Sequence, residues 1–137
     1  MINPLIYFLL FLKASLFSTG GFSHTTCGHL IGHVVLGSMM VERAVNGCDP
    51  RPCTDGQLLE IQHIILSHHG SLEFGSPVQP MTVEAEIIHW ADEASAKSND
   101  MVESLEDREA FSDGEEISSK RPWRVGRRIW RRPHGWE

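Results

Sequence analysis

Residues 57–70 read QLLEIQHIILSHHG, and this stretch decides the fold class. Leu58, Ile61 and Ile65 recur at helical spacing, which predicts an amphipathic helix with one face buried in a core. The next residue at that spacing is His68, followed by a second histidine and a glycine. The sequence therefore predicts a helix whose apolar stripe ends in metal-type ligands.

A second helical pattern runs from His29 to about Val45. Its apolar residues recur at helical spacing, with the small Gly37 on the same side. His33 lies beside this stripe, so we expect its imidazole to face the core. Asn46 and the following glycine predict the helix end. The stripe consists of Leu30, Val34, Val41 and Val45.

A third helix is predicted from Val83 to about Asn99, with Leu105 as the alternative end. Thr82 is a favourable N-cap residue for it. Its expected inward face carries Ala85, Ile88 and Ala96, with Asp92 between the last two. These three helical patterns, without strand-like alternation, predict an all-α fold.

Asp92 is the most informative residue of the third helix. A carboxylate on an apolar stripe is costly unless it is paired or bound to a metal. Two readings stay open, namely an ion pair with Lys97 or Arg43, and a metal ligand. The histidines have a similar ambiguity, because a single inward histidine is usually a satisfied core residue. Ligand-type groups from three helices facing one core favour a buried metal site formed by His33, His68, His69 and Asp92.

Composition and charge fit one soluble domain. The chain has 137 residues, 41% of them hydrophobic, and a net charge of −6. Residues 120–137 nevertheless hold seven of the twelve basic side chains. Such a segment is a solvated tail, pairs with the acidic body, or binds nucleic acid by phosphate contacts and base stacking. The nucleic-acid reading assigns contacts to Arg121, Arg124, Arg127, Arg128, Arg131, Arg132, Trp123 and Trp130.

Several function classes are disfavoured by what the sequence lacks. The three cysteines show no CxxC pair, so we expect reduced thiols in a cytoplasmic protein rather than a disulfide framework or structural zinc site. Nucleophile-elbow, phosphate-loop and dinucleotide fingerprints are also missing. The apolar run Leu5–Leu12 is too short to span a bilayer, and no basic residue precedes it as in a signal peptide. We expect no membrane association.

Four stretches carry a resemblance to a known family. They are residues 28–37 (GHLIGHVVLG), 64–77 (IILSHHGSLEFGSP), 80–85 (PMTVEA) and 89–97 (HWADEASAK). Together they resemble the HD-domain part of the YhaM-type 3′–5′ exoribonucleases. The resemblance implies a partial HD-domain helical bundle that binds a divalent metal, manganese with magnesium as the alternative, and hydrolyses phosphodiesters at the 3′ ends of single-stranded RNA.

Carried over to this sequence, the resemblance makes His33, His68, His69 and Asp92 the metal ligands. The loop Ser71–Met81 would line the substrate entrance. Family members also carry a His-Asp doublet shortly before the position of Gly28, whereas the first aspartate here is Asp49.

The missing doublet leads us to expect an N-terminally truncated member with weakened metal binding and impaired hydrolysis. Self-association or a complementing chain would then complete the site. The alternatives are an inactive remnant that binds RNA through its basic tail, and a gene fragment without function. The expected organisation is an apolar segment at 1–24 outside the resemblance, a partial HD domain at 25–110, and an irregular, basic, tryptophan-containing extension at 111–137.

Overall fold

A computed structural model of the chain describes residues 25–134. The chain divides into two compact units, Met1–His89 and Trp90–Glu137. The predicted all-α class is confirmed, because the described residues form four α-helices and two short 3-10 helices and no β-strand. The expected apolar segment at 1–24 lies outside the described residues. The other expected boundary, between 110 and 111, stays a prediction.

From residue 25 onward, the first unit has two helices where the sequence pattern predicted one. Helix α2 spans Thr26–Ile31 and helix α3 spans His33–Asn46. Gly32 separates them with a φ of +80°, a left-handed conformation that glycine adopts readily. The predicted stripe is therefore wrong at Leu30, which is 81% exposed on α2. The break instead makes His33 the first residue of α3.

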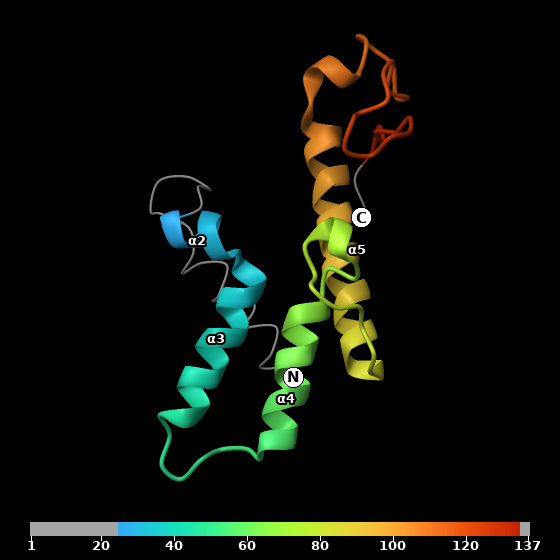
Figure 1. Cartoon of the computed structure of the whole chain (residues 1–137). Coiled ribbons are helices and arrows are strands. Elements are labelled where there is room, and N and C mark those ends of the chain that lie inside the picture. The colour runs from blue at the N-terminus through green and yellow to red at the C-terminus, as the bar shows by residue number, and fades with distance from the viewer. Residues whose placement is uncertain (1–24, 135–137) are drawn as a thin grey trace. The chain divides into compact units, whose positions relative to one another are not determined.

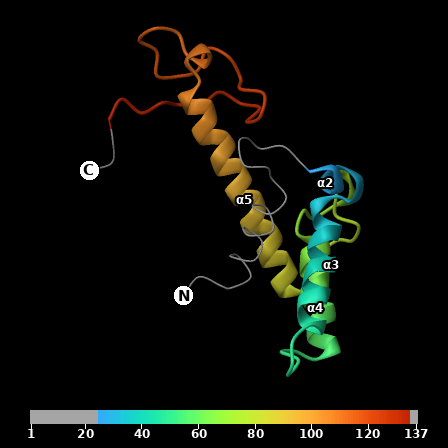
Figure 2. The same cartoon turned by 90° about the vertical axis from the view of Figure 1, so that its left-hand side faces the viewer.

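Helix α3 packs against α4, which spans Asp55–Ser67 (Figure 1). A loop joins the two at one end of the pair (Figure 2). Their shared core contains Val41 and Val45 from α3 and Leu58 and Ile65 from α4. The stripe predicted for residues 57–70 is thus confirmed at Leu58 and Ile65, and Ile61 packs against the same core half-buried.

Helix α4 has a capping box at its start. The Thr54 hydroxyl accepts from the Gln57 backbone N–H at 3.3 Å, and the Gln57 side chain accepts from the Thr54 N–H at 2.9 Å. This reciprocal pair satisfies two backbone donors that a helix end would otherwise leave without partners. It fixes where α4 begins.

A single helix, α5, spans Val83–Glu106 and continues from the first unit into the second. The expected cap is confirmed, because the Thr82 hydroxyl accepts from the Ala85 N–H at 3.1 Å. Within the first unit, Ala85 and Ile88 pack on Ile64 of α4. The end near Leu105 is the correct alternative. The inward face predicted further along is wrong at Ala96, which is exposed.

The second unit is held by a small core of its own. Ala110, Phe111 and Ile129 are buried there, with Met101, Leu105 and Val125 packed against them. A 3-10 helix, η2, covers Arg108–Ala110, and Ile117 and Trp130 form an isolated antiparallel bridge. The irregular C-terminal segment is therefore folded back on α5.

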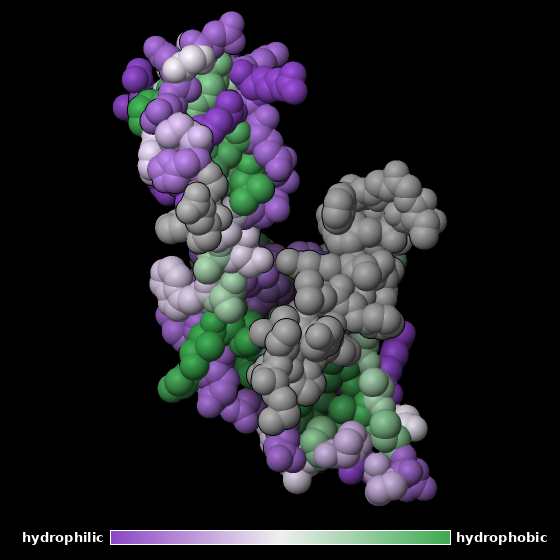
Figure 3. All heavy atoms as spheres, turned by 180° about the vertical axis from the view of Figure 1, so that it is seen from behind, coloured by the Kyte–Doolittle hydropathy of each residue, from purple (hydrophilic) through white to green (hydrophobic). Residues whose placement is uncertain are grey.

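The face seen in Figure 3 carries an exposed hydrophobic cluster on the first unit. Hydrophilic atoms cover most of the visible face of the second unit, whereas hydrophobic side chains reach the surface where α5 begins (Figure 3). Met81, Val83 and Ile87 are 83%, 71% and 61% exposed there. None of the helices among residues 25–134 combines the length and the apolar character needed to cross a bilayer.

Candidate metal centre

Three of the four predicted ligands meet in the first unit. One ring nitrogen from each of His33, His68 and His69 lies within 4.8 Å of the others. The Nε2 atoms of His33 and His69 are 3.2 Å apart, although 36 positions separate the residues in sequence. The His68 and His69 ring centroids are 4.1 Å apart. His68 is buried, and the other two are half-buried.

Local backbone geometry brings the rings together. Helix α4 ends at Ser67, and the next two residues form a turn. The Gly70 N–H donates to the Ser67 carbonyl at 2.8 Å, and Gly70 has a φ of +83°. The adjacent histidines therefore leave the helix on a tight turn that places both rings near the start of α3.

Backbone carbonyls orient two of the imidazoles. His68 Nδ1 lies 2.7 Å from the Ile65 carbonyl oxygen, and His69 Nδ1 lies 2.7 Å from that of Phe74. A carbonyl only accepts, so each Nδ1 must carry the proton that it donates. In the neutral ring, Nε2 is then the nitrogen with the lone pair. Such an arrangement is typical of metal-binding histidines.

The contact between His33 and His69 fits the same assignment. With His69 in its neutral form, its Nε2 accepts and the His33 Nε2–H donates across the 3.2 Å gap. A proton thus lies between two imidazoles where a metal ion would bind. Two nitrogens each about 2.1 Å from one ion, and separated by 3.2 Å, subtend roughly 100°. This angle lies between the octahedral and tetrahedral values, so the pair fits one shared ion.

Two further side chains support the turn. His89 Nδ1 donates to the His68 carbonyl at 2.9 Å, and its ring packs directly on Gly70. The buried Ser76 hydroxyl accepts from the His69 backbone N–H at 3.0 Å. The sequence pattern held no signal for Ser76. That contact depends on how the loop folds back.

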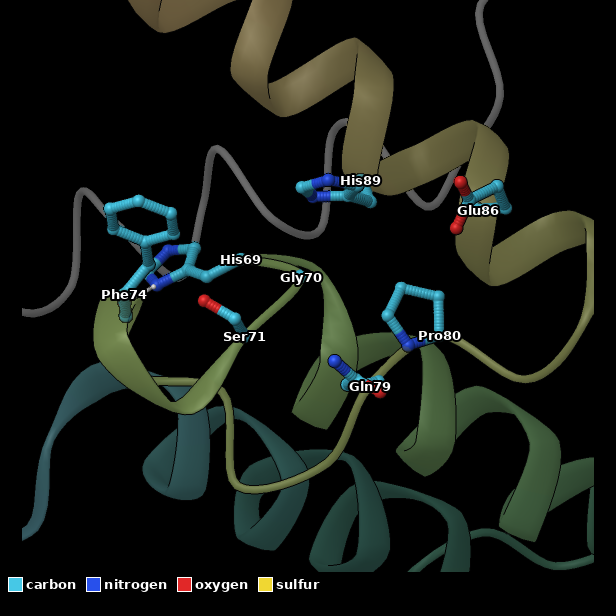
Figure 4. A pocket seen from close by; sticks show the side chains of 8 residues that line it. All are labelled: His69, Gly70, Ser71, Phe74, Gln79, Pro80, Glu86 and His89. Atoms are coloured by element: carbon cyan, nitrogen blue, oxygen red, sulfur yellow. Dashed lines mark hydrogen bonds between the residues drawn. The ribbon is translucent and has the colours of Figure 1, made fainter.

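A pocket of about 350 Å³ adjoins the cluster at His69. Glu86 and His89 reach into it from α5, while the other residues come from the turn and loop after α4 (Figure 4). The family resemblance placed a substrate entrance at this loop but did not single out Glu86. The spacing of three residues between Glu86 and His89 is the signal that could have found it. The lining residues are His69, Gly70, Ser71, Phe74, Gln79, Pro80, Glu86 and His89.

The fourth predicted ligand, Asp92, is not one of the three clustered residues. It is half-buried on the part of α5 that belongs to the second unit. Lys97, one of the cations considered as its partner, lies 3.6 Å from Glu93. The role of Asp92 as a ligand stays a prediction.

The basic C-terminal segment makes intramolecular contacts at two arginines. Arg124 forms ion pairs with Asp100, at 3.6 Å, and with Glu103. The Arg131 guanidinium donates to the Leu105 carbonyl and lies 3.8 Å above the Phe111 ring. The pairing of tail and body that the charge pattern left open is thus present.

Other side chains proposed for nucleic-acid contacts lie at the surface. Trp123 is 85% exposed. Trp130 is 49% exposed, and its indole N–H donates to Glu116 at 3.0 Å. Besides Arg124, four arginines of the set are exposed, namely Arg121, Arg127, Arg128 and Arg132.

Comparison with known proteins confirms the resemblance. Over 84 residues the chain is 43% identical to the 3′–5′ exoribonuclease YhaM of Bacillus subtilis strain 168. The aligned segment covers 61% of this chain and 26% of the relative. The identity to the same-named proteins of Bacillus pumilus and Bacillus licheniformis is 42% over 84 residues. No protein-family model and no solved structure matches. The chain spans about a quarter of the length of these curated relatives, and over that segment it resembles the YhaM 3′–5′ exoribonucleases.

Proposed function

We propose that the chain binds a divalent metal ion through His33, His68 and His69 and hydrolyses phosphodiester bonds at the 3′ ends of single-stranded RNA. The convergence of the three imidazoles carries this proposal, since two of them share a hydrogen bond across 36 positions of sequence. The similarity to proteins named 3′–5′ exoribonucleases supplies the reaction and the substrate.

The donor set favours a transition metal ion. Neutral imidazoles suit first-row transition ions, whereas magnesium takes oxygen ligands. Three histidines by themselves therefore fit zinc or iron better than magnesium, and manganese fits them best with an added oxygen ligand. Asp92, if it joins them, would add the oxygen ligand that manganese favours. When bound, such an ion would supply Lewis-acid activation of water and stabilise charge on the phosphate oxygens.

The protein's own groups hold the site in a ready conformation. The Ile65 and Phe74 carbonyls orient the rings of His68 and His69 before a cation binds. His89 holds the His68 backbone. The pocket beside His69 provides space for a substrate group next to the imidazoles.

We further propose that hydrolysis by this chain alone is weak. The four candidate ligands include one carboxylate, and residues 1–41 contain no aspartate or glutamate. A site for two ions usually needs a bridging carboxylate, and a second copy or another chain is a source for it. Activity that rises steeply with protein concentration, or on adding a complementing chain, would support this part of the proposal.

The test uses the full chain, stripped with a chelator and then titrated with Mn²⁺, Zn²⁺ or Mg²⁺. We expect His68→Ala and His69→Ala to weaken Mn²⁺ binding by at least about tenfold, as removal of a ligand or its supporting partner typically does. His29→Ala is the matched control, because His29 is an exposed histidine outside the cluster.

The same variants are then compared in metal-dependent release of nucleotides from a 5′-labelled RNA. Asp92→Ala should reduce release if the carboxylate is a ligand. Equal Mn²⁺ affinity for the unsubstituted chain and the His69→Ala variant would overturn the proposed site.

A second candidate function is RNA binding by the basic segment without hydrolysis. The 85% exposure of Trp123, next to exposed arginines, favours it. Replacing Arg127 and Arg128 by alanine should then weaken binding of an oligonucleotide. The slope of log affinity against log salt should also become shallower, by about one for each arginine that pairs with a phosphate. Unchanged affinity and slope would exclude phosphate pairing by these two arginines.

A further inference from the structure

The pocket beside His69 has features that the metal site does not use. Its volume of about 350 Å³ lies near the lower end of the roughly 300–1,000 Å³ typical of small-ligand pockets. It therefore suits one small ligand. Because His69 belongs to both, a ligand in the pocket would lie next to the imidazole cluster.

The Ser71 hydroxyl lines this pocket and needs a partner. Among the described residues, its Oγ is buried and accepts or donates no hydrogen bond. A buried hydroxyl without a partner is costly, and native proteins usually satisfy such groups with a ligand or water. A polar group of a bound molecule would remove that cost.

Phe74 supplies an aromatic face at the edge of the pocket. Its side chain is 66% exposed on the 3-10 helix η1, Leu72–Phe74, and it lines the pocket together with His69 (Figure 4). The backbone there is held, because the Phe74 carbonyl accepts from His69. Exposed aromatic rings on fixed backbone are the usual stacking surfaces for unpaired bases.

The remaining side chains supply the polar contacts that a nucleoside needs. Gln79 offers both a donor and an acceptor, which suits the edge of a base. The Glu86 carboxylate accepts hydrogen bonds, which suits sugar hydroxyls. Both line the pocket, one from the loop and one from α5 (Figure 4).

We propose that this pocket binds a single nucleoside of the substrate strand, with its base on Phe74 and its sugar hydroxyls toward Glu86. The identification of that nucleoside as the 3′-terminal one rests on the proposed function. In that hydrolysis a water oxygen would form a bond to the phosphorus, and the bond from this phosphorus to the 3′ oxygen of the preceding nucleoside would break. That 3′ oxygen would take up a proton, and the nucleoside held here would leave as its 5′-monophosphate.

The test measures adenosine binding to the full, metal-free chain by two-dimensional NMR titration. Adenosine carries no phosphate, so removing a negative charge from the protein does not change its attraction electrostatically. We expect Phe74→Ala to weaken adenosine binding roughly 5- to 100-fold, the range that corresponds to removing one stacking surface. Phe74→Trp should retain binding.

Leu72→Ala is the matched control for Phe74. Leu72 is 81% exposed on the same 3-10 helix but does not line the pocket. We expect its substitution to change affinity less than twofold. Glu86→Gln is compared in the same way with Glu84→Gln, an exposed acid of α5 outside the pocket.

The results separate the two proposals. Weaker adenosine binding in Phe74→Ala and Glu86→Gln, but not in their controls, supports the pocket even if the chain hydrolyses no RNA with any metal. If hydrolysis of hexa-adenylate depends on His69 but Phe74→Ala and Leu72→Ala bind adenosine with equal affinity, the nucleoside pocket is overturned and the proposed hydrolysis stands. The two-dimensional NMR spectra of each variant and its control should show the same backbone signals, which excludes misfolding as the cause of a change in affinity.

Discussion

Gly70→Ala should disrupt the turn that presents His68 and His69. Gly70 has a φ of +83°, and a Cβ built there would lie 2.4 Å from His89 Cε1 and 2.8 Å from its Nε2. Contacts this short force neighbouring atoms to move, and here those atoms belong to the rigid imidazole ring of His89. That ring is held by its hydrogen bond to the His68 carbonyl. The substitution therefore forces either the ring or the turn to move.

The expected cost has two parts. A left-handed backbone conformation costs a residue with a Cβ about 1–2 kcal/mol. Displacing His89 breaks its hydrogen bond to the His68 carbonyl, and an unsatisfied polar group at a buried residue costs about 1–3 kcal/mol. Together these lower the free energy of unfolding by about 2–5 kcal/mol. Metal binding should weaken as well, because the same turn orients both imidazoles.

Urea unfolding followed by circular dichroism measures this cost. Gly32→Ala is the matched control, since Gly32 has a similar φ of +80° and nothing within 4 Å of a built Cβ. We expect Gly70→Ala to be more destabilising than the control by about 1–3 kcal/mol. In a His89→Ala background that excess should vanish, because the obstructing ring is gone. Equal destabilisation by Gly70→Ala and Gly32→Ala would refute the reasoning.

Three further predictions concern stability in each unit. Thr54→Ala removes the N-cap of α4 and should lower the free energy of unfolding, measured by urea denaturation, by about 1 kcal/mol. An unchanged free energy of unfolding would mean that the capping box contributes nothing. Ile65 is 1% exposed, so Ile65→Ala should lower the free energy of unfolding by about 2–5 kcal/mol. Leu59→Ala, on the exposed face of the same helix, should change it by no more than about 0.5 kcal/mol. Similar values for the two variants would contradict the observed packing of Ile65. Arg131→Ala should destabilise the second unit by about 1–3 kcal/mol, because it removes the guanidinium that binds the Leu105 carbonyl and stacks on Phe111. Arg128 is an exposed arginine of the same segment, and an equal effect of Arg128→Ala would contradict the stabilising role of the Arg131 contacts.

Helix positions followed from local patterns, and errors occurred where backbone geometry or packing intervened. The capping residue Thr82 and the stripe ending in His68 depend on spacing along one helix, so they could be predicted. The break at Gly32 could not, because a glycine within an apolar periodic segment is compatible with either a continuous or a divided helix. Leu30 was misplaced for that reason. Ala96 was misplaced because periodicity indicates a face but not whether another element covers it.

The candidate metal site likewise has a part that could be predicted from the sequence and a part that depends on tertiary structure. The sequence by itself singled out His33, His68, His69 and Asp92 as candidate metal ligands, and it placed His68 and His69 together at a helix end before a glycine. Only the tertiary structure decided that His33 lies 3.2 Å from His69, that the Phe74 carbonyl orients the His69 ring, and that a pocket with Glu86 adjoins it. Spacing along a helix is a local property of the chain. Contacts across 36 positions instead depend on how α3 packs on α4 and on how the loop after α4 folds back.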